Sequence, residues 1–222
     1  MPELASRRFR FVVFDWDGTL VDSTGLIVAA IQAACRDIGE PVPDAETASY
    51  VIGLGLADTL RHIVPALDPS RHHELVISYR DHYLAGDARI PLFPGARDLL
   101  DELDGAGFKL GVATGKSRAG LERALGQHRL AHRFVATRCG DEGFPKPHPD
   151  MLLHLMRHVG ADPGETLMVG DTTHDVELAQ NAGVAAIAVS YGAHPPAGLA
   201  ERQPLALVHS VDELRRWLVD NG

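Results

Sequence analysis

Four loops in this sequence carry carboxylates, a hydroxyl and a lysine shortly after apolar runs. The residues are Asp15, Asp17, Thr114, Gly115, Lys146, Asp171 and Asp175. Each loop alone has a structural explanation, because an aspartate often caps a turn or a helix and a lysine is usually exposed. Four separate turns have no structural reason to supply this combination in this order. The set therefore predicts a reactive site.

The spacing of Asp15 and Asp17 indicates transfer of a phosphoryl group through a covalent intermediate. Residues two apart on an extended chain point to the same side. Asp15 could then attack phosphorus while Asp17 protonates the leaving oxygen and later activates water. Hydrolysis of a phosphate monoester is among the slowest uncatalysed reactions, so positioning and electrostatics must supply most of the acceleration.

A reaction between two anions also needs cations. Hard carboxylate oxygens with no thiolate nearby favour Mg²⁺. Lys146 lies between Pro145 and Pro147, which restrict the backbone on both sides and would hold its ammonium group in place. We therefore expect a magnesium ion and Lys146 to act together at this site.

The elements that would position these side chains are short apolar runs, each ended by polar residues or glycine, as in buried parallel strands. The runs are 9–14, 109–113, 134–136, 166–169, 185–189 and 205–208. Helical patterns lie between most of them, for example at 96–103 and 211–218. This alternation predicts an α/β fold with a parallel sheet, whose ligands bind beyond the carboxyl ends of the strands.

One segment breaks the alternation. Residues 26–84 contain helical patterns separated by prolines and no convincing strand. They predict an inserted helical cap, with hinges near 21–25 and 86–94. The expected organisation is a core domain of residues 1–20 and 89–222 and a cap domain of residues 21–88.

Four motifs resemble, in the correct order, those of the haloacid dehalogenase (HAD) superfamily. They are Asp15-Trp16-Asp17-Gly18-Thr19-Leu20-Val21-Asp22-Ser23, Thr114-Gly115, Lys146-Pro147-His148-Pro149 and Gly170-Asp171-Thr172-Thr173-His174-Asp175. The resemblance covers nearly the whole chain and is strongest to phosphoglycolate-phosphatase-like enzymes. It implies a Rossmann-like three-layer sandwich with a mostly parallel sheet and a helical cap of the C1 type. Trp16 replaces the smaller aliphatic residue common in the first motif, and we expect it to pack under its loop.

The resemblance also implies a role for each motif residue. Asp15 would be the nucleophile and Asp17 the general acid and base. Asp15, the Asp17 carbonyl group and Asp171 would hold Mg²⁺, with Asp175 supporting the metal shell.

At the phosphoryl group, the resemblance implies that Thr114 and the Gly115 amide would bind oxygens and that Lys146 would neutralise charge. The segment 51–56 resembles the cap loop that faces the active site in the subfamily. Gly53 and Gly55 would then approach the substrate, unless this segment is an ordinary turn between helices.

Composition limits the partners. The formal net charge is −9, so we expect neither nucleic acid nor a membrane as a partner. Two cysteines without paired spacing predict reduced thiols and a cytoplasmic location. The expected partner is a small phosphorylated metabolite, with 2-phosphoglycolate as the first candidate, and the chain would be a monomer or a weak homodimer.

Other functions remain open from the sequence. A β-phosphoglucomutase-like sugar-phosphate mutase would keep the same core residues, and a non-catalytic regulator that binds a phosphorylated metabolite could keep the fold. Asp17 argues against the metal-free dehalogenases, which generally lack it. A phosphonate hydrolase would need a cap lysine, and no lysine precedes Lys109.

Overall fold

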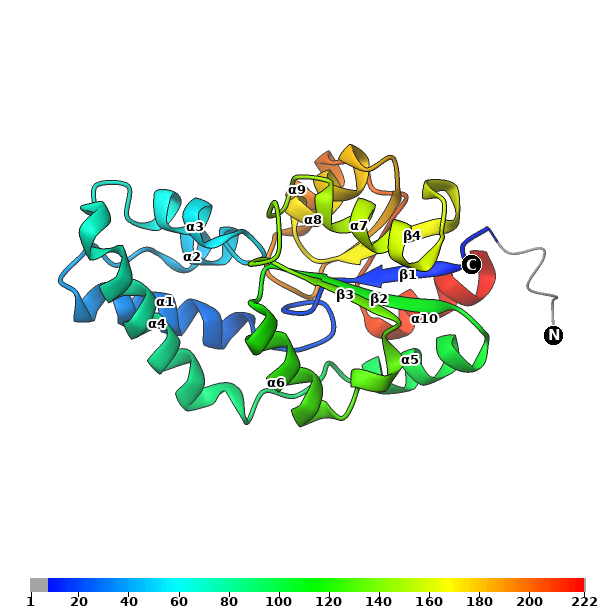
Figure 1. Cartoon of the computed structure of the whole chain (residues 1–222), viewed down its shortest axis with the longest axis horizontal. Coiled ribbons are helices and arrows are strands. Elements are labelled where there is room, and N and C mark those ends of the chain that lie inside the picture. The colour runs from blue at the N-terminus through cyan, green and yellow to red at the C-terminus, as the bar shows by residue number, and fades with distance from the viewer. Residues whose placement is uncertain (1–7, 222) are drawn as a thin grey trace.

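The computed structural model describes residues 8–221 and contains one six-stranded parallel sheet (Figure 1). The strand order is β3-β2-β1-β4-β5-β6. The strands are β1 (Phe11–Phe14), β2 (Lys109–Thr114), β3 (Ala136–Cys139), β4 (Thr166–Gly170), β5 (Ala185–Val189) and β6 (Ala206–Val208). The order reverses at β1, which lies between β2 and β4, so the switch point is at the strand that ends next to Asp15. Residues 1–7 of the expected core segment, and residue 222, lie outside the described part.

Helices cover both faces of this sheet (Figure 1). One layer holds α5 (Ala96–Gly105), α6 (Arg118–His128) and α10 (Val211–Asn221), and the other holds α7 (Asp150–Val159), α8 (Thr173–Asn181) and α9 (Pro196–Glu201). Along β1, Val12 and Phe14 pack against the first layer, and Phe11 and Val13 against the second. The strand is buried on both faces, which explains its continuous apolar sequence. The predicted three-layer α/β sandwich is confirmed.

Residues 24–87, between β1 and α5, form a helical block that contains its own hydrophobic cluster. Its helices are α1 (Thr24–Asp37), α2 (Ala45–Tyr50), α3 (Leu56–Ile63) and α4 (His72–Asp87). The two connections to the sheet lie side by side, because Val21 bridges Leu92 and the Asp22 amide donates to the Pro91 carbonyl. They fall in or beside the two predicted hinge regions. The division into a core and a cap domain stays a prediction.

The third strand lies further along the chain than the sequence pattern predicts. The apolar run at 134–136 overlaps β3 only at Ala136, and the strand continues to Cys139 through Thr137 and Arg138. Phe134 packs in the core before the strand begins, and β3 is an edge strand whose central side chains are only half-buried. Hydrophobicity therefore does not mark this strand.

Short 3-10 turns complete the described elements: η2 (Pro69–Arg71), η3 (Ala131–Arg133) and η4 (Pro163–Glu165). Across residues 8–221, no helix combines the length and the apolar character needed to cross a membrane.

Candidate active site

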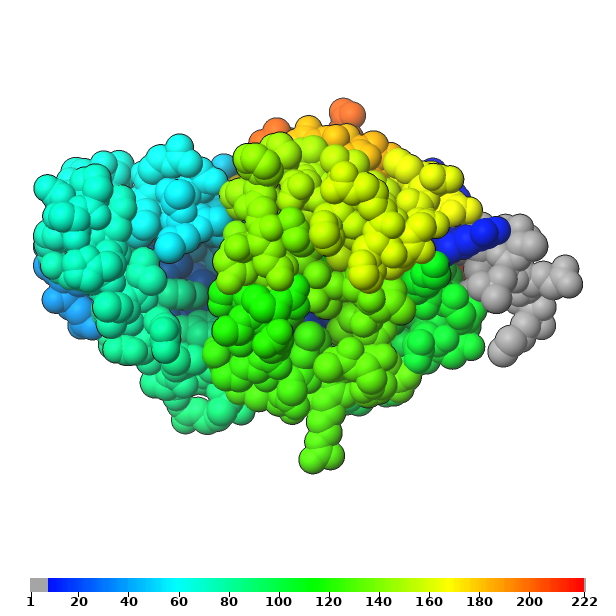
Figure 2. Space-filling model, in the orientation of Figure 1, coloured from blue at the N-terminus to red at the C-terminus, as the bar shows by residue number. Residues whose placement is uncertain are grey.

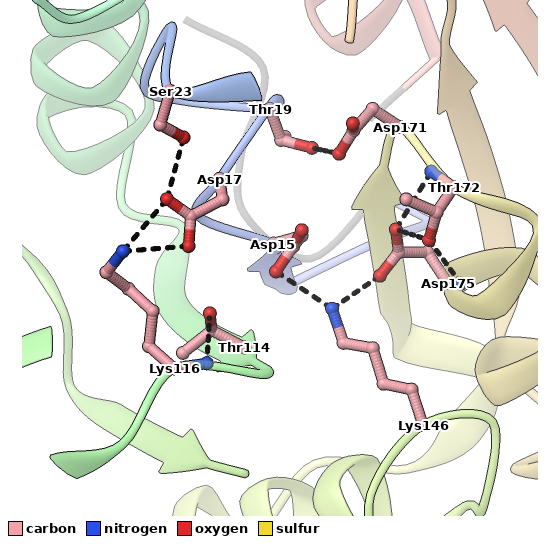
Figure 3. Close-up of polar contacts among 10 residues, drawn as sticks. All are labelled: Asp15, Asp17, Thr19, Ser23, Thr114, Lys116, Lys146, Asp171, Thr172 and Asp175. Atoms are coloured by element: carbon pink, nitrogen blue, oxygen red, sulfur yellow. Dashed lines mark hydrogen bonds and ion pairs between the residues drawn. The ribbon is translucent and has the colours of Figure 1, made fainter. Parts of the chain in front are cut away.

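The predicted residues meet at the carboxyl ends of the central strands (Figure 3). Asp15 follows β1, Thr114 ends β2, Asp171 follows β4, and Lys146 comes from the loop before α7. Asp15, Lys146 and Asp171 are at most 1% exposed. Three loops distant in the sequence therefore place charged side chains in one buried site, next to Thr114 at the end of β2.

Lys146 joins two of the carboxylates. Its Nζ lies 2.8 Å from Oδ1 of Asp15 and 2.6 Å from Oδ1 of Asp175 (Figure 3). Neither oxygen of Asp15 accepts a hydrogen bond of normal geometry from the described residues, and both are buried. Asp15 is thus held by one ion pair and remains open to a further ligand or an electrophile.

Asp175 is fixed by the start of α8. Thr172 caps this helix, and Oδ2 of Asp175 accepts hydrogen bonds from the Thr172 amide at 3.0 Å and hydroxyl at 2.7 Å. This capping box is encoded locally, since the two residues are three apart at a helix start. One oxygen of Asp175 therefore accepts hydrogen bonds at the start of α8, and the other pairs with Lys146. These contacts suit a residue that holds Lys146 in position.

Asp171 is fixed by two loops. Its Oδ1 accepts a hydrogen bond from the Thr19 hydroxyl at 2.8 Å, and its Oδ2 from the Ala193 amide at 2.7 Å. The loop after β1 passes so close that a Cβ added at Gly18 would lie 2.1 Å from Oδ2 of Asp171. Gly18 also has φ +82°, a conformation that favours glycine. The glycine in the first motif thus permits Asp15 and Asp171 to share one site.

Burial and mutual repulsion dominate the electrostatics of these carboxylates. Burial raises the pKa of Asp15 from 3.8 to about 7, with Lys146 opposing the rise and Asp175 adding to it. Burial, followed by repulsion from Asp15 and Asp175, raises the pKa of Asp171 well above its usual value. Burial would lower the pKa of Lys146, but attraction to Asp15 and Asp175 outweighs burial and the net pKa is raised. Lys146 therefore stays charged, and the carboxylates need further positive charge.

The donor set fits a divalent cation. Asp15, Asp171 and Asp175 each offer an oxygen, and these oxygens lie within 4.8 Å of one another. Three carboxylates against one lysine leave an excess of negative charge, and the buried oxygens of Asp15 have no other hydrogen-bond donor among residues 8–221. Hard oxygen ligands of this kind suit Mg²⁺.

Asp17 is held by residues to which sequence reasoning assigned no role. Oδ1 of Asp17 accepts a hydrogen bond from Ser23 at 2.7 Å, and Nζ of Lys116 lies 2.9 and 3.0 Å from the two oxygens. Lys116 also donates to the Tyr83 hydroxyl at 2.8 Å, so this lysine links Asp17 to α4. The position of Lys116 two residues after Thr114 could have marked it as a site residue. Nothing in the sequence pointed to a role for Tyr83.

The segment 51–56 lies against the site. A Cβ added at Gly115 would be 2.8 Å from the Gly53 carbonyl oxygen, and one added at Gly55 would be 2.6 Å from Cβ of Pro145. The structure thus brings Gly53 and Gly55 to the loops that carry Gly115 and Lys146. It also buries Trp16, whose ring lies 6.4 Å from that of Phe134, in agreement with its expected packing.

Comparisons with known proteins show what the whole chain is similar to. A family model described as haloacid dehalogenase-like hydrolase matches residues 12–189. The chain is 37% identical to a protein named "Probable phosphatase IndB" from Dickeya dadantii, with 91% of this chain and 90% of that protein covered. It is 32% identical to a protein named "Phosphoglycolate phosphatase" from Vibrio vulnificus, over 95% of this chain and 96% of that protein.

One further relative and one solved structure are also similar to this chain. The "Tyrosine-protein kinase PtkA" of Mycobacterium tuberculosis is 33% identical, over 94% of this chain and 72% of that protein. Among solved structures, a predicted phosphatase from Clostridium acetobutylicum has a TM-score of 0.84 at 26% identity, covering 96% of this chain and 99% of that one. The fold of this chain therefore also occurs in the structure from Clostridium acetobutylicum.

Proposed function

Because the chain belongs to the haloacid dehalogenase-like hydrolase family, we propose that it is a phosphatase that hydrolyses a small-molecule phosphate monoester through Asp15. The observation that carries this proposal is the buried Asp15 carboxylate, held by Lys146 and open to a further partner. Phosphatase-named relatives support the same reaction class.

In the first step, an oxygen of Asp15 attacks phosphorus, and the bond from phosphorus to the ester oxygen breaks. The product is an aspartyl-phosphate, and Asp17 delivers a proton to the leaving alcohol. Lys146 holds Asp15 in place and neutralises part of the combined charge, since its Nζ lies 2.8 Å from the nucleophile.

In the second step, Asp17 takes a proton from water as the water attacks phosphorus, which releases phosphate and restores Asp15. Ser23 and Lys116 orient the Asp17 carboxylate for both transfers. The Thr114 hydroxyl and the Gly115 amide would bind phosphoryl oxygens at the end of β2.

The metal in this proposal is Mg²⁺, held by Asp15, Asp171 and the Asp17 carbonyl group, with Asp175 supporting them. When bound, it would supply positive charge to the phosphoryl oxygens and to the carboxylates. Support comes from the close grouping of three buried carboxylates and from the raised pKa values of Asp15 and Asp171.

The helical block would act as a cap over this site. The contacts of Gly53 and Gly55 with the core loops and the link from Lys116 to Tyr83 support that role. Opening of the cap would admit substrate, and closing would exclude water and orient Asp17. We also propose a cytoplasmic location, in keeping with two buried free cysteines, and a monomer or weak homodimer.

The test is release of phosphate from p-nitrophenyl phosphate with and without Mg²⁺. A panel of monoesters follows, and it includes 2-phosphoglycolate, because the relative from Vibrio vulnificus is named for that substrate. We expect release that depends on the metal. Exchange of phosphate between two positions of a sugar without net release would indicate a mutase. Binding without turnover of any ester would indicate a non-catalytic regulator.

A further inference from the structure

A cavity of about 600 Å³ extends from Asp15 and Asp17 into the helical block. Its wall includes Ile31, Leu60 and Leu75, which also belong to the hydrophobic cluster of that block. Figure 2 shows a recess between the helical block and the rest of the molecule, with blue atoms from the N-terminal part of the chain at its base. The interior of the helical block is therefore hollow on the side that faces the reactive carboxylates.

Most of the charged side chains that line this cavity come from the core. At the reactive end are Asp15, Asp17 and Thr114, together with Lys116, whose ammonium group is already bound to Asp17 and Tyr83. Two further charged residues of the core line the cavity: Arg123 is paired with Asp87 at 2.6 Å, and Asp141 accepts a hydrogen bond from the Arg118 amide at 2.9 Å.

The helical block itself contributes little charge. Among its described residues that line the cavity, the one charged side chain is Arg80, which is exposed. The other polar side chains there are the hydroxyls of Thr59, Tyr79 and Tyr83. Arg80 is thus the one cation that the described part of the helical block offers along this wall. A carboxylate placed among these helices away from Arg80 would be an unpaired buried charge, which is strongly unfavourable.

The size of the cavity matters as well. Its volume of about 600 Å³ lies within the range of about 300–1,000 Å³ that small-molecule pockets cover. The two-carbon acid part of 2-phosphoglycolate would fill a small fraction of it. The wall of the cavity within the helical block consists mainly of apolar side chains, and a ligand with a hydrocarbon part would displace water from it.

We propose that the substrate is the phosphate monoester of an uncharged alcohol with a large hydrocarbon part, alkyl or aryl, which lies among α1, α3 and α4 while its phosphoryl group lies at Asp15. This inference rests on the proposed phosphatase activity and specifies the alcohol that is released. The hydrocarbon part displaces water from the apolar wall, and binding strengthens with the apolar area that becomes buried.

The test is a homologous series of substrates with an identical phosphoryl end: ethyl, butyl, hexyl and octyl phosphate, assayed with Mg²⁺ by phosphate release. We expect kcat/KM to rise about threefold for each added methylene until the cavity is filled, which makes hexyl phosphate better than ethyl phosphate by about 10²-fold. A flat or falling series would overturn the proposal, and so would 2-phosphoglycolate as the best substrate.

A second comparison isolates charge. Hexyl phosphate and 6-phosphonooxyhexanoate have the same chain, but the latter ends in a carboxylate. We expect the carboxylate to lower kcat/KM by at least about tenfold. A preference for the acid would contradict the proposal and point to Arg80 as its partner, which Arg80→Gln would then test.

Two neighbouring residues on α4 provide a matched pair of variants. Val76 lines the cavity and is half-buried, whereas Ile77 does not line it and is 56% exposed. Val76→Phe should reduce the ratio of kcat/KM between hexyl and ethyl phosphate by about tenfold or more, and Ile77→Phe should leave this ratio unchanged. Equal ratios in the two variants would contradict the proposed position of the hydrocarbon, and thermal melts would confirm that both variants are folded.

Failure of the phosphatase proposal would be recognised separately. If none of these esters is hydrolysed, titration calorimetry of the same series with the wild-type chain and Mg²⁺ measures binding alone. Affinity that rises with chain length would support the apolar site while removing the phosphatase proposal. Affinity independent of chain length would overturn the inference about the cavity.

Discussion

Replacing Asp15 by asparagine should stabilise the metal-free protein at neutral and alkaline pH. The reason is the environment of the carboxylate, which is 1% exposed and close to two other acids. Burial raises its pKa from 3.8 to about 7, so the folded state disfavours the charged form. Asparagine keeps the shape of the side chain and carries no charge.

The magnitude follows from the linkage between protonation and folding. A pKa that is raised in the folded state gives no penalty below the unfolded value of 3.8. The penalty grows as the pH rises from about 4 to about 7 and is constant above the folded value. At about 1.4 kcal/mol for each pH unit, it reaches up to about 4 kcal/mol.

The assay is urea unfolding of the wild type and of Asp15→Asn in EDTA, at several values between pH 4 and pH 8. The free energies of unfolding should be similar near pH 4 and should diverge in favour of the variant by up to about 4 kcal/mol at pH 8. Excess Mg²⁺ should raise the stability of the wild type more than that of the variant. A difference that does not change with pH would mean that Asp15 does not titrate in this range and would contradict the raised pKa.

Three further changes test individual contacts. Lys146→Met should lower the free energy of unfolding by about 3–5 kcal/mol in chemical denaturation, because Asp15 and Asp175 lose their buried cation; an unchanged midpoint would contradict the importance of these ion pairs. Asp171→Asn should raise the Mg²⁺ concentration for half-maximal activity by at least about tenfold, and an unchanged metal dependence would remove this residue from the ligand set. Gly115→Ala should lower kcat/KM by about tenfold or more, because the added Cβ would lie 2.8 Å from the Gly53 carbonyl oxygen. Gly126→Ala, where a Cβ meets nothing within 4 Å, is its control, and equal activity of the two variants would exclude a close approach during catalysis.

The sheet and the main residues of the site could be predicted because their signals are local. Buried strands of a parallel sheet have continuous apolar sequences, and the residues that follow them are brought to one edge by the fold itself. The loops after β1 and β4 are therefore close in space. The Thr19 hydroxyl, for example, donates a hydrogen bond to Asp171, although the two residues are 152 positions apart in the sequence. The capping box of Asp175 is also readable, since its two partners are three residues apart.

Other features depend on packing that no local pattern records. The third strand is at the sheet edge, where Thr137 and Arg138 replace apolar residues. The contact between Lys116 and Tyr83 joins a loop of the core to a helix of the inserted block. The cavity arises from the spacing of the helices around Ile31 and Leu75, and the sequence identifies these residues simply as apolar positions of amphipathic helices.

The central claim is that Asp15 forms a covalent bond to phosphorus. It is tested most directly by acid-quenching the enzyme during turnover of a ³²P-labelled monoester with Mg²⁺ and mapping the labelled peptide. We expect an acid-stable, hydroxylamine-sensitive label on the peptide that contains Asp15, and no such label in Asp15→Asn. Full turnover with no labelled protein at any quench time, or a label on another peptide, would contradict it.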